Sequence, residues 1–486
     1  MNNQIHSVKY NFLMNFVLTA SNFIFPLVTF PYISRVLGAA GNGKVNFAAS
    51  VANYFMMVAS LGIPTYGVKA CAKVRDDKEE LSQVAQEILI INLVTTILAT
   101  ITYGICLFTI PKLKMDKTLY LIEGINIILN MFGANWFYQA LEQYDYITGR
   151  SIFFKFISVI LMFIIVRGAN DYRLFAATTV FASAGSNVVN FVRLKKYISF
   201  HRRKKYCFAR HMKPILILFA QSAATMIYTN LDTVMLGVIK SDRDVGFYNA
   251  AVKVKYILVS LVSSFGNVLL PRMSYYVKGN QKKNFEHLLA EALNAVLFIA
   301  IPLSTYFLCE AKDCMLFLAG PEYKDAVITM QLINLAVLPI GLTTVIGIQT
   351  LTPLNREHQV LFSVLVGAFA DFILNLMMIP TWGASGAAFA TVVAEYLVLL
   401  VQMIMGRDII NSVWKNVHCL KYLGITGMAM IPLIVTEKWT SHLNIVIRLL
   451  ATSGIFIVVV FFLLYAAKDE LLMKILDNRI AGRLLK

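Results

Sequence analysis

The sequence predicts an all-α polytopic membrane protein with about 14 transmembrane helices. Of its 486 residues, 58% are hydrophobic and only 15% are charged, and the mean hydropathy is +0.66. Soluble domains carry about 25% charged residues. Apolar stretches of about 20 residues, long enough to cross a ~30 Å hydrocarbon core, recur along the whole chain. The spacers between them are short, so we expect no soluble domain and no catalytic centre folded outside the membrane.

The predicted spans follow one another closely. They lie near residues 11–34, 45–66, 84–110, 119–141, 147–166, 174–192, 214–239, 246–270, 287–309, 327–351, 359–380, 384–405, 418–436 and 445–467. The first run is interrupted by Asn15, Asn22, Pro26 and Pro31. It therefore differs from the apolar core of about 7–15 residues in a cleavable signal peptide.

The basic residues predict the orientation of the spans. A net charge of +17 could indicate nucleic-acid binding, but most Lys and Arg residues lie between the apolar runs, where they set topology. They are concentrated on the side of the N-terminus, above all in residues 193–205. The positive-inside rule then places both termini in the cytoplasm. We expect a multi-pass membrane protein with no nucleic-acid partner.

The same basic segment suggests how the chain is divided. We expect an N-terminal six-helix lobe at 1–193, a cytoplasmic linker at 194–213, a second six-helix lobe at 214–405, and two extra helices with a cytoplasmic tail at 406–486. A weak repeat supports two related halves, because Leu37-Gly38 followed by Gly43 is echoed by Leu236-Gly237 followed by Gly246. Chance similarity between apolar segments is the alternative. Internal repeats around a central site are typical of transporters.

Enzyme signatures are weak. The six cysteines form no CxxC or Cys/His cluster, so neither a metal site nor a disulfide framework is indicated. There is no Walker A motif. Asp242-Arg-Asp244 matches the short DxD pattern of glycosyltransferases but lies in a tiny predicted loop. The histidines lie in loops or at span ends, which argues against a histidine proton relay. We expect no enzymatic activity, no metal and no cofactor.

Polar residues recur on one face of four predicted spans. The spacing of three or four residues places Asn15, Thr19 and Asn22 on one face of the first span, and Asn46 and Asn249 begin similar stripes in spans 2 and 8. Another stripe in span 7 includes Asp232. Hydrogen bonding between helices would explain any single stripe. Four stripes at matching positions favour a shared polar cavity.

The charges in and near these spans predict a site for anionic groups. Lys253 and Lys255 in span 8 and Asp232 in span 7 would lie at similar depth, so an ion pair between Asp232 and Lys253 is one interpretation. A second cation would then remain for an anionic substrate. The further candidate substrate-binding residues are Arg35, Lys44, Lys155, Asn46 and Asn249.

Two carboxylates occur in spans 11 and 12. Asp371 shares a face with Asn375, and Glu395 shares one with Thr391. Proton or cation coupling is one interpretation of Asp371, Glu395 and Asp232. A structural role in holding the shape of the cavity is equally open.

Four segments carry a resemblance to a known family. They are Phe25–Gly38 with Gly43–Phe47, Ser60–Gly67 with Lys73–Lys78, Asn230–Gly237 with Val245–Ala251, and Asp371–Asn375 with Ile379-Pro380, Gly383–Thr391 and Glu395. In this order they resemble the polysaccharide transporter family of O-antigen and capsule repeat-unit flippases. That family belongs to the multidrug/oligosaccharidyl-lipid/polysaccharide exporter superfamily.

The resemblance implies a fold and an activity. It implies two pseudo-symmetric six-helix lobes in a V around a central cavity, plus two C-terminal helices. It also implies alternating-access flipping of undecaprenyl-diphosphate-linked oligosaccharide from the inner to the outer leaflet. The implied partners are the lipid-linked oligosaccharide and membrane lipid, with other polysaccharide assembly proteins as further candidates. The rival interpretations are an ion-coupled drug or cation antiporter of the same superfamily and a membrane glycosyltransferase or polymerase.

Overall fold

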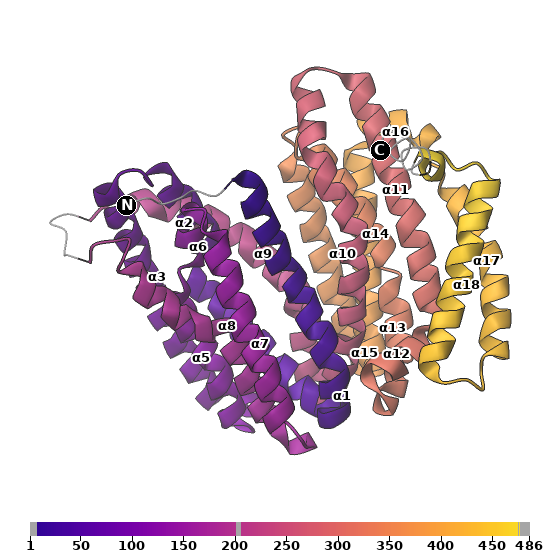
Figure 1. Cartoon of the computed structure of the whole chain (residues 1–486). Coiled ribbons are helices and arrows are strands. Elements are labelled where there is room, and N and C mark those ends of the chain that lie inside the picture. Colours follow the sequence, from indigo (N-terminus) through magenta and orange to yellow (C-terminus); the bar gives the residue numbers. More distant parts are fainter. Residues whose placement is uncertain (1–6, 201–205, 475, 477–486) are drawn as a thin grey trace. The chain divides into compact units, whose positions relative to one another are not determined.

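A computed structural model describes residues 7–200, 206–474 and 476, and these residues form helices joined by short turns (Figure 1). The chain forms two compact units, residues 1–246 and 247–486. Each unit is considered by itself. The prediction of an all-α polytopic membrane protein is confirmed. The predicted lobe boundaries stay a prediction, and residues 201–205 of the basic linker lie outside the described part of the chain.

The first unit is a bundle of long helices with short helices at its ends. Its elements are α1 (Val8–Ser60), α2 (Ile63–Lys73), α3 (Lys78–Thr109), α4 (Pro111–Lys114), α5 (Lys117–Gly133), α6 (Asn135–Ala140), α7 (Tyr144–Ile165), η1 (Ala169–Asp171), α8 (Tyr172–Leu194) and α9 (Ala209–Ile239). The first turn of α10 (Asp242–Lys278) also belongs to it.

Glycine shapes the longest helix of this unit. Helix α1 is kinked at Gly38, where φ is +66° and ψ is −177°, a conformation that favours glycine. Beyond the kink, α1 packs closely on the start of α10. A Cβ atom at Gly43 would overlap the carbonyl of Asp242, and one at Gly246 would overlap that of Ala39. The two glycines that recur in the halves of the sequence therefore allow one close helix contact.

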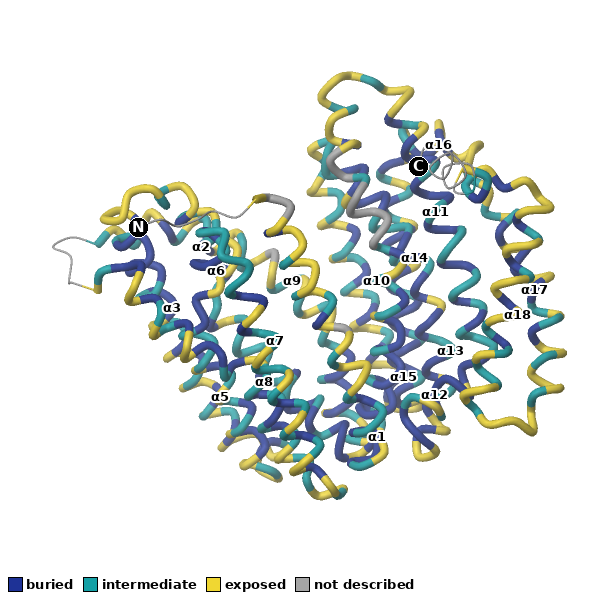
Figure 2. Tube along the Cα trace, viewed as in Figure 1, coloured by how far each residue is buried: buried dark blue, intermediate teal, exposed yellow. Residues whose placement is uncertain are grey.

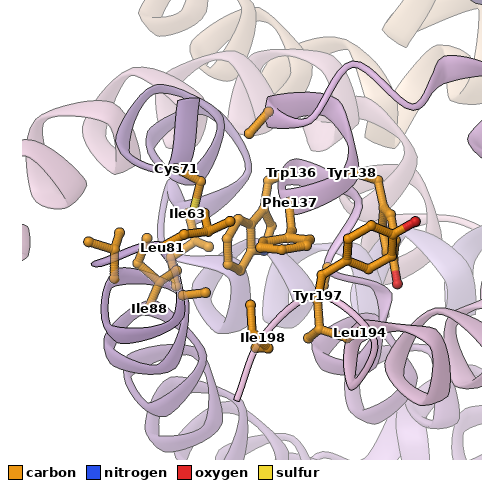
Figure 3. Close-up of a cluster of buried hydrophobic side chains, with 14 of the residues drawn as sticks. Ile63, Cys71, Leu81, Ile88, Trp136, Phe137, Tyr138, Leu194, Tyr197 and Ile198 are labelled. Carbon is orange, nitrogen blue, oxygen red and sulfur yellow. The ribbon is translucent and has the colours of Figure 1, made fainter. Parts of the chain in front are cut away.

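An aromatic cluster closes one end of the first unit (Figure 3). Phe137 and Tyr138 are fully buried, and the Trp136 ring fills the space beside Gly67 of α2. The Tyr138 hydroxyl donates to the carbonyl of Asn190 at 2.6 Å, so the polar end of this buried ring is satisfied. The cluster ties the short helices α2 and α6 to α3 and α8.

Successive connections of this unit gather at alternate ends. At one end, Arg75 after α2 pairs with Glu142 before α7 at 2.7 Å. At the other end, Arg173 in α8 pairs with Asp116 before α5 at 2.9 Å. Neighbouring spans therefore run in opposite directions. Which end faces the cytoplasm stays a prediction.

The second unit is also a helical bundle, and two helices are added at its C-terminal end. After α10 it contains α11 (Lys282–Cys309), α12 (Ala311–Ala319), η2 (Pro321–Ala326), α13 (Val327–Asn334), α14 (Val337–Thr343), η3 (Thr344–Leu351), α15 (Glu357–Met405), α16 (Arg407–Val413), η4 (Trp414–Asn416), α17 (Cys419–Trp439) and α18 (Ile445–Ala466). Helices α17 and α18 pack on α11 through a shared apolar core.

The exposed side chains indicate which medium surrounds the helices. Burial is concentrated where helices of one unit face each other (Figure 2). On the outside, large apolar side chains stay exposed, for example Ile457 at 65% and Val458 at 67%. A soluble protein rarely exposes such a continuous apolar surface, whereas a lipid bilayer covers it.

The described residues contain 11 helices long and apolar enough to cross a membrane. Two of these contain two predicted spans each, because α1 and α15 continue through kinks at Gly38 and Gly383. One further predicted span coincides with α5 and α6, and α5 has 17 residues. The total of fourteen stays a prediction.

Candidate functional site

The polar stripe of α1 lies on the surface of the first unit. Asn15, Thr19 and Asn22 are exposed. The Thr19 hydroxyl donates to the carbonyl of Asn15, four residues earlier, at 2.9 Å. Such a bond within one helix satisfies the hydroxyl without a neighbouring helix. The stripe is therefore available to a polar ligand from outside the unit.

Lys155 of α7 reaches this stripe. Its Nζ donates to the Asn22 side-chain oxygen at 2.5 Å and to the Ser21 hydroxyl at 2.9 Å, and it lies 5.9 Å from the centre of the Phe25 ring. Both hydrogen-bond acceptors are neutral. Within the described residues, no carboxylate forms an ion pair with Lys155. The Lys155 side chain therefore adds an amino group to the polar face of α1.

The other candidates of the first unit that lie on α1 follow the Lys155 contact at Asn22 along that helix. The Arg35 side chain is exposed and donates to the carbonyl of Pro31 at 2.7 Å. The Lys44 ammonium lies 4.8 Å from the centre of the Tyr172 ring. The Asn46 amide donates to the carbonyl of Asn42 at 2.8 Å, so this donor serves its own helix. Of these residues, Arg35 is the most accessible to an anion.

The carboxylates of the second unit lie in a helical hairpin. Helix α15 turns at Gly383, where φ is +54° and ψ is −129°. Its two halves pack closely, because a Cβ atom at Gly367 would overlap Val398. Asp371 lies twelve residues before the turn and Glu395 twelve residues after it, so they occupy the same level. They are 1% and 8% exposed.

Helix α10 contacts this hairpin through a tyrosine hydroxyl and also carries the two candidate lysines. The Tyr248 hydroxyl and the Thr391 hydroxyl are 3.1 Å apart. Lys253 follows Tyr248 by five residues on α10, and Glu395 follows Thr391 by four on α15. Lys255 is buried, 5.2 Å from the centre of the Tyr256 ring.

Asn249 is half-buried on the same helix, next to the tyrosine that contacts the hairpin. Asp232 is buried in α9 of the first unit. Its predicted pairing with Lys253 would join residues of different units and stays a prediction. Each unit thus holds part of the predicted set of residues, with Lys155 of α7 in the first unit and the hairpin carboxylates in the second.

The second unit also contains an apolar groove. It has a volume of about 630 Å³ and lies between α11 and α18, with Leu261 of α10 at its edge. Leu303 and Tyr306 line it from α11, and Ile457 and Phe461 from α18. Leu261, Ile457 and Phe461 are exposed. The groove is therefore open to an apolar ligand from the outside of the unit.

A polar network that the sequence analysis missed lies in the first unit. The Glu87 carboxylate of α3 is fully buried and is 2.6 Å from Nε2 of His211. The Tyr66 hydroxyl is 2.7 Å from Nδ1 of the same ring. Glu87 also accepts from the Cys207 backbone at 2.9 Å and from Nε of Arg210 at 3.0 Å. A carboxylate within a predicted span was the available signal.

This network fastens the start of α9 to α3 and α2. Glu87 and His211 are 124 positions apart along the chain. The expectation that the histidines lie at span ends agrees with the position of His211 near the start of α9. The burial of its ring against a carboxylate could not be read from that position.

Comparison with known proteins places these features in a family. Residues 8–277 match the model of the family described as "Polysaccharide biosynthesis protein", and residues 208–454 match the model described as "Lipid II flippase MurJ". A candidate O-antigen transporter of Escherichia coli (strain K12) is 22% identical over 84% of this chain and 99% of its own length. The capsular polysaccharide biosynthesis protein CapF of Staphylococcus aureus is 21% identical over 82% of this chain and 97% of its own.

Solved structures share the fold. The lipid II flippase MurJ in an inward closed conformation has a TM-score of 0.72, with 16% identity over 94% of this chain and all of its own. An inward-facing multidrug resistance transporter of the MATE family has a TM-score of 0.59, with 13% identity over 81% of this chain and 99% of its own. The chain therefore belongs to the polysaccharide biosynthesis protein family, the polysaccharide transporters of the multidrug/oligosaccharidyl-lipid/polysaccharide exporter superfamily.

Proposed function

We propose that this protein flips undecaprenyl-diphosphate-linked oligosaccharide repeat units from the inner to the outer leaflet of the bacterial cytoplasmic membrane by alternating access. Both termini would lie in the cytoplasm. The oligosaccharide would supply surface polysaccharide such as O-antigen or capsule. The transport would involve no covalent chemistry and no cofactor.

The apolar groove of the second unit is the observation that carries this proposal. A lipid-linked sugar is divided into a long hydrocarbon tail and a polar, anionic head. The groove between α11 and α18 offers an apolar surface that opens outwards, which suits a polyprenyl tail.

The polar face of α1 supplies the matching surface for the head. The Lys155 ammonium of α7 donates to two neutral acceptors on α1, and the Arg35 side chain of α1 is exposed. Ammonium and guanidinium groups bind phosphate oxygens well. We assign the diphosphate or acidic sugars to Arg35, Lys44, Lys155, Lys253 and Lys255, with Asn46 and Asn249 as further contacts.

Purified protein in liposomes tests the proposal. The substrate is a fluorescent undecaprenyl-diphosphate oligosaccharide, and its transfer between leaflets is followed by a membrane-impermeant quencher. We expect Lys253→Ala to abolish transfer, while Lys312→Ala, which removes an exposed lysine of α12, leaves it unchanged. Wild-type transfer by Lys253→Ala at matched protein level would refute the assignment of that lysine. Absence of transfer by the wild-type protein would refute the function.

The same liposomes separate the rival functions. A drug antiporter would move a cationic dye in response to an ion gradient and would depend on buried carboxylates such as Asp371. A glycosyltransferase would consume a nucleotide sugar. In the DxD segment, Asp242 forms an ion pair with Lys112 at 2.8 Å and Asp244 accepts from the Ser241 hydroxyl. Both acids therefore have structural partners, which favours transport over catalysis.

A further inference from the structure

A buried carboxyl group lies at one end of the apolar groove. Glu310 follows the last residue of α11 and precedes α12. Its side chain is 2% exposed, and neither of its oxygens makes a hydrogen bond within the described part of the chain. An ionised carboxylate without water or donors is strongly disfavoured relative to the neutral acid. The surroundings of Glu310 therefore favour the protonated form.

Neighbouring charges act in the same direction. Asp313 of α12 forms an ion pair with Arg448 of α18, so this arginine is already engaged by another carboxylate. Glu437 of α17 adds a further negative charge near Glu310. Among the described residues, Tyr306 and Cys309 of α11 and Cys314 of α12 also interact with the carboxyl group.

These effects bring the pKa of the Glu310 carboxyl group into the physiological pH range. Burial first, and then the charges of Glu437 and Asp313, raise the pKa of Glu310 to about 7. The nearby hydroxyl of Thr452 and the charge of Arg448 oppose the rise without cancelling it. A change of pH near neutrality therefore changes the charge at this position.

The carboxyl lies next to the contact between α11 and α18. Tyr306, one helical turn before Glu310, lines the groove, and its hydroxyl donates to the carbonyl of Leu449 at 3.2 Å. The same hydroxyl is 3.2 Å from the Thr452 hydroxyl. Ser453, the next residue, lines the groove as well. The polar contact that closes this end of the groove is thus immediately beside Glu310.

We propose that Glu310 is a proton-binding site that controls how tightly α18 packs against α11 and α12 at the end of the groove. With the proton bound, the neutral acid tolerates burial and the helices pack. When the proton leaves to solvent, the carboxylate requires water, and the contact at Tyr306 and Thr452 opens. The consequence for the lipid tail rests on the proposed function, because the groove would hold that tail.

Proton linkage determines whether a rise in pH favours the packed or the open form. The packed form binds the proton more tightly than an open, hydrated form with an ordinary glutamate pKa. Between that ordinary value and about 7, each unit of rising pH lowers the ratio of packed to open form by up to tenfold. Below this window the ratio of packed to open form is at its maximum, and above it no further change is expected.

Infrared spectroscopy of the full chain in lipid nanodiscs tests the proton site directly. The carbonyl stretch of the protonated acid is followed as the pH rises. We expect the wild-type spectrum minus that of Glu310→Gln to show one acid with a midpoint near 7. Glu357→Gln, which removes an exposed carboxylate at the start of α15, should leave the signal unchanged. A flat difference spectrum, or a midpoint at an ordinary glutamate value, would overturn the proposal.

A second variant leaves Glu310 in place. Glu437→Gln removes one of the charges that favour the protonated form, so the midpoint should fall. This measurement decides the matter even if Glu310→Gln does not insert. An unshifted midpoint in Glu437→Gln would show that the nearby charge does not act on Glu310 and would contradict the proposed site.

Binding of a fluorescent polyprenyl diphosphate tests control of the groove. We expect its affinity for the wild-type protein to change between pH 6 and pH 8, that is about one unit either side of the midpoint, and the affinity of Glu310→Gln to be independent of pH. The same pH dependence in both proteins would refute control by Glu310 while leaving the flippase intact. A wild-type protein that shows the infrared titration but binds no polyprenyl diphosphate would refute the proposed function instead.

Discussion

Replacing Glu87 with glutamine tests the network that fastens α9 to the first unit. Oε1 of Glu87 accepts from the Cys207 backbone at 2.9 Å and from the Gln83 amide at 3.2 Å. Oε2 accepts from Arg210 and lies 2.6 Å from His211. Glutamine keeps one carbonyl oxygen and puts an amide group in place of the other. One side of the network must therefore lose its acceptor.

The magnitude follows from the contacts. A hydrogen bond to a charged group contributes about 1.5–3 kcal/mol, and Glu87→Gln removes two of them if the amide faces Arg210 and His211. The Arg210 side chain is 39% exposed, so water replaces part of its loss. We expect a destabilisation of about 3 kcal/mol, at the lower end of the range for breaking a buried ion pair.

Thermal unfolding of purified protein in detergent measures this effect. Wild type, Glu87→Gln and Glu80→Gln are heated at one scan rate, because membrane proteins often unfold irreversibly. Glu80 is an exposed acid in the first turn of the same helix, so its loss should change stability by less than about 1 kcal/mol. Equal unfolding midpoints for the two variants would show that the network contributes no more than a surface charge.

Three other perturbations have defined outcomes. Lys155→Met should slow transfer in the liposome assay about ten- to a hundredfold, the equivalent of one charge-assisted contact to the head group. Lys155→Arg should retain transfer, and equal loss in both variants would argue against a role for the charge. Gly383→Ala should lower the unfolding midpoint by the equivalent of about 1–3 kcal/mol, because φ is +54° there, while Gly424→Ala, with open space around its Cβ, should not. Arg356 donates to both oxygens of Asp408 and lowers its pKa, so the contribution of this pair is complete above the ordinary aspartate pKa and is lost as the pH falls through the lowered value. Because the pair is exposed, Asp408→Asn should change stability at neutral pH by less than about 1 kcal/mol, and a larger change in a urea or thermal titration would contradict this.

Apolar length and local periodicity predicted most of the fold. The predicted span 84–110 ends one residue after the last residue of α3, which comprises Lys78–Thr109. The form of the connection between the predicted spans 359–380 and 384–405 was not predicted, because α15 turns at one residue, Gly383. A hydropathy profile shows where an apolar run ends but not how sharply the chain turns.

The contacts within the candidate site could not be predicted from the sequence, because they join segments that are far apart along the chain. Spacing placed Asn22 on a polar face, but nothing local indicates that Lys155, 133 positions later, bonds to it. Likewise nothing local indicates that Glu87 and His211, 124 positions apart, lie side by side. The burial of Glu310 depends on α17 and α18 packing beside it, and that packing is set by the tertiary structure.

The hairpin of α15 has a consequence for how the protein enters the membrane. A lone acid at the centre of an inserting helix costs about 2.5–3.5 kcal/mol on insertion scales. Asp371 and Glu395 lie on facing halves of one hairpin and at one level, so their polar neighbours Asn375 and Thr391 arrive with them. If the two halves insert together, each acid meets polar groups before it meets lipid. The turn at Gly383 would then serve the biogenesis of the protein as well as its finished form.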